Sequence, residues 1–141
     1  MTTLYLTENE KKLSEHINLR TYEDKYLDRK EEREILEKGL ELEINIDRSL
    51  EIVAYTSEKY NIVLERQVEE KAFDAIKLFN ADGVVTKTEF EDACKLMYDK
   101  SSGKISDYEC QKRLKKFMVD KKIKPKQGWL FNTSWFDDIK V

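Results

Sequence analysis

The amino-acid sequence predicts a mainly α-helical protein, and three observations support this prediction. Only one Pro and four Gly occur among 141 residues, so few positions interrupt a helix. Hydrophobic residues recur at helical spacing over most of the chain. Three Ser or Thr residues, Thr7, Thr86 and Ser106, are each followed three positions later by Glu, which is the capping-box pattern of a helix start. We expect a helical arm at 1–64 and a second domain at 65–141.

The N-terminal arm is predicted to consist of long amphipathic helices. The Thr7–Glu10 capping box opens the first of these at about 8–19, and helical patterns follow at 21–39 and 47–60. Gly39 is the first expected breaker. Residues 40–46 alternate between apolar and polar, as in a strand, but their charged flanks favour a continuing helix, which we expect. Such an arm either forms a homodimer, docks on a partner protein, or covers one side of the C-terminal core.

The second domain shows a definite order of elements. Along the chain these are a helix at 65–80, a β-branched pair at 84–85, a helix opened by Thr86, a turn at 101–103, a helix from 107 to about 121 opened by Ser106, and a short β-hairpin at 122–131. Trp135 in the following tail is expected to pack back over the domain. No internal repeat at a fixed period is visible.

This order resembles the winged helix-turn-helix superfamily, over about residues 66–131. A common pattern there is an apolar residue, a Ser or Thr cap, a small apolar residue, a basic pair, Leu, a second basic pair, and apolar residues leading into the wing. The matching residues are Ile105, Ser106, Cys110, Lys112, Arg113, Leu114, Lys115, Lys116, Phe117 and Ile123. The resemblance indicates no particular family, and Lys121-Lys122 stands where many members have Gly before the wing. It implies contact with double-stranded DNA.

The distribution of charge also favours a nucleic-acid partner. Residues 1–98 carry 15 Lys and Arg against 23 Asp and Glu, whereas residues 99–128 carry 10 against 4. A concentrated basic stretch attracts polyanions. We therefore expect a small DNA-binding protein, a transcriptional regulator or replication-associated factor of phage or plasmid (viral) type, that reads duplex DNA with the helix at 107–121 and the wing at 122–131.

The residues expected to touch DNA lie at the start, on the basic face and beyond the end of that helix. They are Ser106, Tyr108, Gln111, Lys112, Lys115, Lys116, Lys122, Lys124 and Lys126. Free amides at a helix start bind phosphate, Lys provides affinity for the backbone, and Gln111 and Lys112 are able to reach base edges. Asp107 would repel a phosphate there, although it also favours the helix dipole or could accept a hydrogen bond from a cytosine amino group.

Two alternatives remain open at this point. A protein-interaction adaptor or inhibitor would use the acidic arm on the same winged-helix scaffold. A degenerate calcium-binding EF-hand is a lesser alternative, because Leu78–Glu89 fits the loop pattern only from its third position onward and Asp99–Glu109 is one residue short. Glu89 and Glu109 are explained more simply as capping-box residues, so we expect no metal site.

The sequence contains no recognisable catalytic machinery or cofactor motif, and we expect no enzyme activity and no cofactor. The single His, His16, has no nucleophile or carboxylate constellation near it, and no Gly-rich phosphate loop occurs. Cys94 and Cys110 are expected to be reduced, half-buried thiols. No apolar run approaches the roughly 20 residues that span a bilayer, and no signal peptide is visible, so we expect a cytoplasmic protein without membrane contact.

Overall fold

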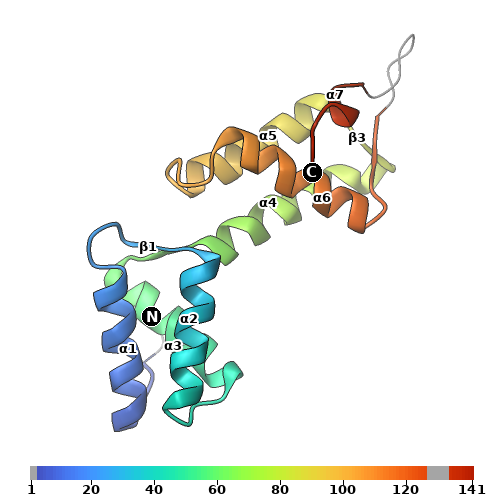
Figure 1. Cartoon of the computed structure of the whole chain (residues 1–141). Helices are drawn as coiled ribbons and strands as arrows, with labels where there is room; N and C mark the ends of the chain where they lie inside the picture. The colour runs from blue at the N-terminus through green and yellow to red at the C-terminus, as the bar shows by residue number, and fades with distance from the viewer. Residues whose placement is uncertain (1–2, 127–133) are drawn as a thin grey trace. The chain divides into compact units, whose positions relative to one another are not determined.

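Helices make up most of the chain that the computed structural model describes, which is residues 3–126 and 134–141. This part forms seven α-helices and four strands of two residues each, so the mainly α-helical prediction is confirmed (Figure 1). The chain divides into two compact units, residues 1–66 and 67–141. Each unit is described separately below.

The first unit packs three helices around a core of its own. It contains α1 (Glu8–Arg20), β1 (Tyr26–Leu27), α2 (Arg29–Glu41), α3 (Ile46–Tyr60) and β2 (Val63–Leu64). The two strands pair in parallel, with Tyr26 opposite Val63 and Leu27 opposite Leu64. Its core consists of Leu13, Ile17, Leu27, Ile35, Ile44, Ile52, Val53, Ile62 and Leu64. The first unit therefore buries its own apolar residues in a separate core.

The connection between α2 and α3 differs from the prediction. The helix continues through Glu41, and residues 42–45 then turn instead of extending the helix or forming a strand. Asn45 ends the turn because its side chain accepts a hydrogen bond from the amide of Arg48 and so caps α3. The role expected for Gly39 was wrong, since it lies inside α2. A Cβ at Gly39 would lie 2.2 Å from Ser49 Oγ, so this glycine allows α2 and α3 to approach each other.

The second unit consists of a helical hairpin joined to short strands. It contains α4 (Glu65–Phe79, which begins at the end of the first unit), a 3-10 turn at Asn80–Asp82, β3 (Val84–Val85), α5 (Lys87–Lys100), α6 (Asp107–Asp120), β4 (Lys124–Pro125) and α7 (Ser134–Asp137). The strand expected at 122–125 is present in part as β4, but it pairs in parallel with β3. The second strand of the predicted hairpin, at 129–131, lies outside the described residues.

The two units repeat the same order of elements: helix, strand, helix, helix, strand. The first strand of each unit begins in the same way. The carboxylates of Asp24 and Asp82 accept hydrogen bonds from the amides two residues later, at 3.2 and 3.4 Å. The residue between has a positive φ in both units, 53° at Lys25 and 96° at Gly83.

The later elements of the two units also correspond. The helices α2 and α5 both begin with a complete capping box, at Asp28 and at Thr86. The amides of Ile62 and Ile123, which follow the third helix of each unit, both donate to the carbonyl five residues earlier, at 2.9 and 2.8 Å. The period is not fixed, because the connection between α5 and α6 is longer than that between α2 and α3. The features that the two units share are at turns and helix caps, whereas their core side chains differ. The sequence therefore shows no visible repeat.

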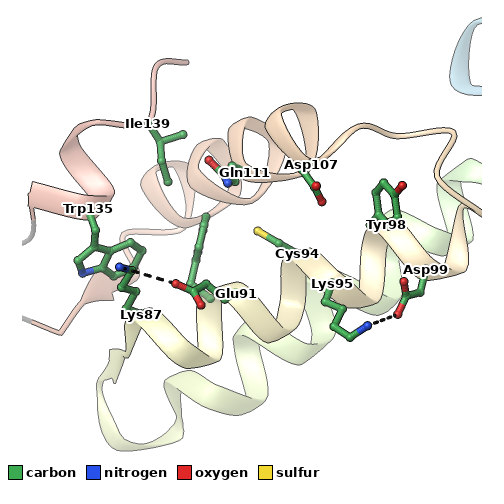
Figure 2. Close-up of a pocket in the computed structure, with 11 residues that line it drawn as sticks. Lys87, Glu91, Cys94, Lys95, Tyr98, Asp99, Asp107, Gln111, Trp135 and Ile139 are labelled. Atoms are coloured by element: carbon green, nitrogen blue, oxygen red, sulfur yellow. Dashed lines mark hydrogen bonds and ion pairs between the residues drawn. The ribbon is translucent and has the colours of Figure 1, made fainter.

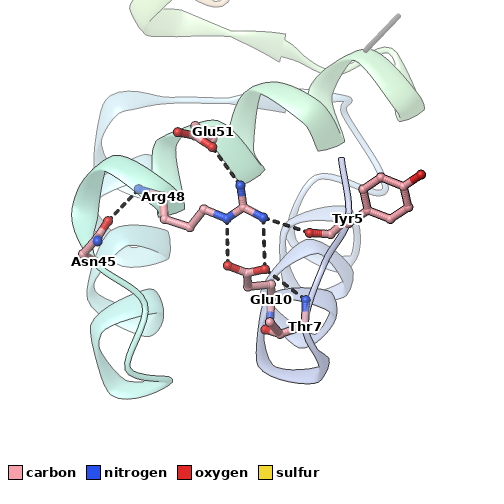
Figure 3. A network of polar contacts seen from close by, with 6 residues as sticks. All are labelled: Tyr5, Thr7, Glu10, Asn45, Arg48 and Glu51. Carbon is pink, nitrogen blue, oxygen red and sulfur yellow. Dashed lines mark hydrogen bonds and ion pairs between the residues drawn. The ribbon is translucent and has the colours of Figure 1, made fainter. Parts of the chain in front are cut away.

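An arginine fixes the start of the first unit. Arg48 on α3 donates to both carboxylate oxygens of Glu10, at 2.7 and 3.1 Å, and also to the carbonyl of Tyr5 and the carboxylate of Glu51 (Figure 3). The hydrogen bond from Arg48 is the main cause that lowers the pKa of Glu10, followed by the amide of Thr7. One side chain therefore joins α1, α3 and the segment before α1.

Gly39→Ala should destabilise the first unit by about 1–3 kcal/mol, because the new methyl group overlaps Ser49 Oγ. Urea denaturation followed by circular dichroism measures this. Ser49→Ala is the matched control: its hydroxyl is buried and has no hydrogen-bond partner among the described residues, so removing it should cost little and should partly restore the stability of Gly39→Ala. A double variant no more stable than Gly39→Ala would contradict the proposed contact.

The bond between Arg48 and Glu10 should make stability depend on pH. Because folding lowers the pKa of Glu10, its contribution is present above the unfolded-state pKa and is lost as pH falls through the folded-state pKa. The difference in melting temperature between the wild type and Glu10→Gln should therefore be largest near neutral pH and should shrink below about pH 4. A difference that stays constant from neutral to acid pH would rule out the ionised bond as its source.

Candidate nucleic-acid interface

Helix α6, which carries most of the predicted DNA contacts, has one face inside the second unit. Cys110, Leu114 and Met118 are fully buried, as their spacing predicts. Beside them Phe117 stacks on Phe73 of α4, with ring centroids 4.3 Å apart. The ends of α6 and its two remaining faces therefore decide what the helix can bind.

One remaining face is open to solvent and combines two lysines with two apolar side chains. Tyr108 is 56% exposed and Val119 57% exposed. Lys112 lies 3.8 Å from Glu109 and over the ring of Tyr108, and Lys116 lies 3.2 Å from Asp120. Exposed pairs within one helix are weak, so either lysine can exchange its carboxylate for a phosphate at little cost.

The other face contacts the C-terminal segment. The ammonium group of Lys115 donates to the carbonyl oxygens of Phe136 and Ile139, both at 2.8 Å, and lies 4.9 Å from the centroid of the Phe136 ring. Gln111 lines a pocket on the same side (Figure 2). The structure thus separates Lys115 and Gln111 from Lys112 and Lys116, although all four were expected to act together.

The start of α6 is already capped and is acidic. The hydroxyl of Ser106 accepts from the amide of Glu109 at 3.2 Å. The predicted capping box is only half formed, because the Glu109 carboxylate lies beside Arg113 and Lys112 instead of bonding back to Ser106. The negative charges of Asp107 and Glu109 in the first turn offset the positive end of the helix dipole, so this end of the helix repels phosphate.

Cations gather instead at the end of α6 and along β4. Lys121, Lys122, Lys124 and Lys126 are all exposed, and no ion pair engages them within residues 3–126 and 134–141. The backbone there is ordered by β3, since Val84 and Val85 pair with Lys124 and Pro125, and the amide of Lys126 donates to the carbonyl of Val85 at 2.7 Å. Lys121 was not among the predicted contacts, although the basic run in the sequence includes it.

The pocket beside Gln111 has a volume of about 430 Å³ and lies between α5, α6 and the C-terminal segment. Its apolar lining is formed by Phe90, Cys94, Trp135 and Ile139 (Figure 2). The packing of Trp135 agrees with the prediction, because its ring lies 5.3 Å from that of Phe90. Two ion pairs on α5 line the rim, Lys87 with Glu91 and Lys95 with Asp99.

The two cysteines are more deeply buried than expected and form no disulfide. Burial is the main cause that raises the pKa of Cys94 to about 12, and the electrostatic effect of the neighbouring Cys110 is the second cause. Burial and the charge of Asp107 raise the pKa of Cys110 to about 11. Both thiols therefore stay protonated near neutral pH, a form that is a poor nucleophile and a poor metal ligand.

The loop with EF-hand features is organised by hydrogen bonds of its own. The Glu89 carboxylate, which would bind calcium from the last loop position, accepts from the amide of Thr86 at 2.9 Å. Asp82 accepts from the amide of Val84. In the described part of the chain, no group of three or more His, Cys, Asp or Glu side chains is placed to hold a metal ion. None of its helices is long and apolar enough to cross a bilayer.

Comparison of the chain with known proteins identifies no relative. No family model matches the chain, and no curated protein or solved structure shows significant similarity to it.

Replacing Lys115 should expose the C-terminal segment, whereas replacing its neighbour should not. We expect Lys115→Met to increase acrylamide quenching of Trp135, because three hydrogen bonds to the carbonyls at 136, 137 and 139 are lost. Lys116→Met removes the same charge from an exposed pair and is the matched control. Both variants are made in a Trp129→Phe background, so that Trp135 is the only tryptophan. Equal quenching in the two variants would contradict this role of Lys115.

Proposed function

We propose that the second unit binds the phosphate backbone of double-stranded DNA through lysines at the end of α6 and along β4. The observation that carries the proposal is the group formed by Lys121, Lys122, Lys124 and Lys126, which are exposed and engaged in no ion pair within the described residues. Cations left unpaired in a chain of net charge −3 are available to an external anion.

Lys112 and Lys116 extend this group on the solvent face of α6. Their carboxylate partners, Glu109 and Asp120, are at least 40% exposed, so water already weakens these pairs. Ser106, Gln111 and Lys115 are left out of the proposed contact, because the first caps α6, the second faces the pocket and the third holds the C-terminal segment.

Such an interface recognises shape and charge more than sequence. Each lysine that neutralises a phosphate releases condensed counterions, so the affinity depends steeply on salt. The exposed Tyr108 and the half-buried Lys112 are the side chains of α6 that remain able to reach a base edge, which supports only limited discrimination between sequences. The proposed role is a small, non-enzymatic regulatory or replication-associated DNA-binding protein of phage or plasmid type that acts in the cytoplasm.

The order of elements in the second unit supports a winged helix-turn-helix as the architecture of this proposal. The sequence α4, β3, α5, α6, β4 has the helix, short strand, helical hairpin and following strand of that superfamily. The parallel pairing of β4 with β3 departs from a simple hairpin wing. The lysines of the proposed wing are nonetheless presented on ordered backbone.

A second candidate, the protein-interaction adaptor or inhibitor, is favoured by the surface of the first unit. That unit carries 11 Lys and Arg against 16 Asp and Glu, and it exposes Leu40 and Ile46. An acidic surface with exposed apolar residues is suited to a protein partner and repels phosphate. The two functions are compatible, since they use different units.

The triple variant Lys121→Gln, Lys122→Gln, Lys124→Gln should bind DNA at least about tenfold more weakly at 50 mM salt. The slope of log affinity against log salt should become shallower by about 2–3, since roughly 0.9 is lost for each phosphate contact. Fluorescence anisotropy with a labelled random duplex measures both quantities. The matched control replaces Lys71, Lys95 and Lys100, three exposed lysines elsewhere in the same unit, with Gln. Equal losses in the two triple variants, or folded wild type that fails to bind at low salt, would refute the proposal.

A further inference from the structure

The repeated order of elements allows the same groove to be compared in both units. In the second unit, the groove between α5 and α6 is partly covered by the chain's own C-terminal segment. Phe136 and Ile139 are buried there, and Phe136 packs edge-on against Phe90 of α5 with ring centroids 6.2 Å apart. Lys115 holds this segment through its backbone carbonyls. The groove between these two helices therefore holds a C-terminal segment that is helical at Ser134–Asp137 and extends beyond it to Ile139.

In the first unit α2 and α3 correspond to α5 and α6, but this unit lacks a segment corresponding to α7. Its β2 leads directly into α4, so nothing equivalent to α7 follows the third helix. The capping residues align the two units, with Asp28 matching Thr86 and Asn45 matching Ser106. By this alignment the first-unit counterparts of Cys94, Tyr98, Asp107, Gln111 and Lys115 are Leu36, Leu40, Ile46, Leu50 and Ala54.

These counterparts form an apolar strip where the second unit is mostly polar. Leu40 is 54% exposed and Ile46 is 49% exposed. Leu36 and Leu50 are half-buried, yet neither belongs to the core of the first unit or packs against it. We name these four residues the α2–α3 strip. Leu40 and Ile46, at the adjoining ends of α2 and α3, therefore expose apolar surface to solvent.

The charges around the α2–α3 strip indicate what it binds. Glu37, Glu43 and Asp47 are exposed, and no cation pairs with them within the described residues, whereas Glu41 pairs with Lys38 at 3.7 Å. Ala54 stands where Lys115 holds the C-terminal segment of the second unit. The surroundings therefore favour basic residues on the ligand and disfavour an acidic segment such as the one that carries Asp137 and Asp138.

We propose that the α2–α3 strip is a docking site for a short amphipathic helix of a partner protein, with two apolar side chains three or four residues apart and Lys or Arg beside them. Binding places the apolar pair between α2 and α3, as Phe136 and Ile139 lie between α5 and α6 of the second unit. The flanking cations of the ligand meet Glu37, Glu43 and Asp47. This activity is independent of the proposed DNA contact, which uses other residues of the other unit.

The probe is a synthetic peptide with the sequence of residues 134–141 in which Asp137 and Asp138 are replaced by Lys, titrated into the full chain with methyl-labelled Leu and Ile. We expect the largest NMR shifts at Leu36, Leu40, Ile46 and Leu50. The unmodified peptide should bind about tenfold more weakly, because its two carboxylates face an acidic rim. Absence of shifts at these four residues at millimolar peptide, or equal binding of the two peptides, would overturn the proposal.

Leu40→Asp should weaken binding of the basic peptide by about tenfold or more, since it places a charge in the apolar strip. Leu19→Asp is the matched control, because Leu19 is 74% exposed on α1, outside the strip. Circular dichroism confirms that both variants fold, as expected for exposed positions. Equal binding by Leu40→Asp and Leu19→Asp would contradict the site. Sedimentation in which the wild type dimerises and Leu40→Asp does not would show a second copy as the occupant, which also overturns the proposal.

Discussion

Each unit is closed around its pair of packed helices by one short parallel bridge, β1 with β2 in the first unit and β3 with β4 in the second. In each unit the bridge joins the segment before the second helix to the segment after the third, and so connects the two ends of the helical pair. The closing bonds are short: Val63 donates to the carbonyl of Lys25 at 2.8 Å, and Lys126 donates to that of Val85 at 2.7 Å. Because this frame is made by backbone, the side chains outside it are free to differ between the units.

That freedom is used in opposite ways. In the second unit β4 and the residues on either side of it include Lys121, Lys122, Lys124 and Lys126, and the groove between α5 and α6 is partly covered by the C-terminal segment. In the first unit the corresponding strand is apolar and partly buried, and Leu40 and Ile46, at the adjoining ends of α2 and α3, are exposed. A common frame therefore presents a cationic edge in one unit and an apolar strip with acidic residues around it in the other, which is why different classes of partner are proposed for the two units.

Local features of the fold could be predicted from the sequence, and long-range ones could not. The capping boxes at Thr7 and Thr86 and the buried stripe of α6 depend on residues three or four positions apart, and all are present. The box at Ser106 failed in part because Arg113 and Lys112 compete for Glu109. The role of Gly39 depends on Ser49 of the next helix, and the parallel pairing of β4 depends on a strand far earlier in the chain. The spacing of residues within a single segment does not predict such contacts between separate elements.

Lys115 and Lys116 show why residue type alone does not identify a binding surface. They are adjacent, carry the same charge and fall within the same basic pattern, yet one donates to three carbonyls of the C-terminal segment and the other extends into solvent beside Asp120. A lysine that already satisfies its donors within the protein would have to break those bonds before it reached a phosphate, which costs more than opening an exposed ion pair. The DNA contact is therefore expected where cations are left without partners, at the end of α6 and along β4, and not over the whole basic helix.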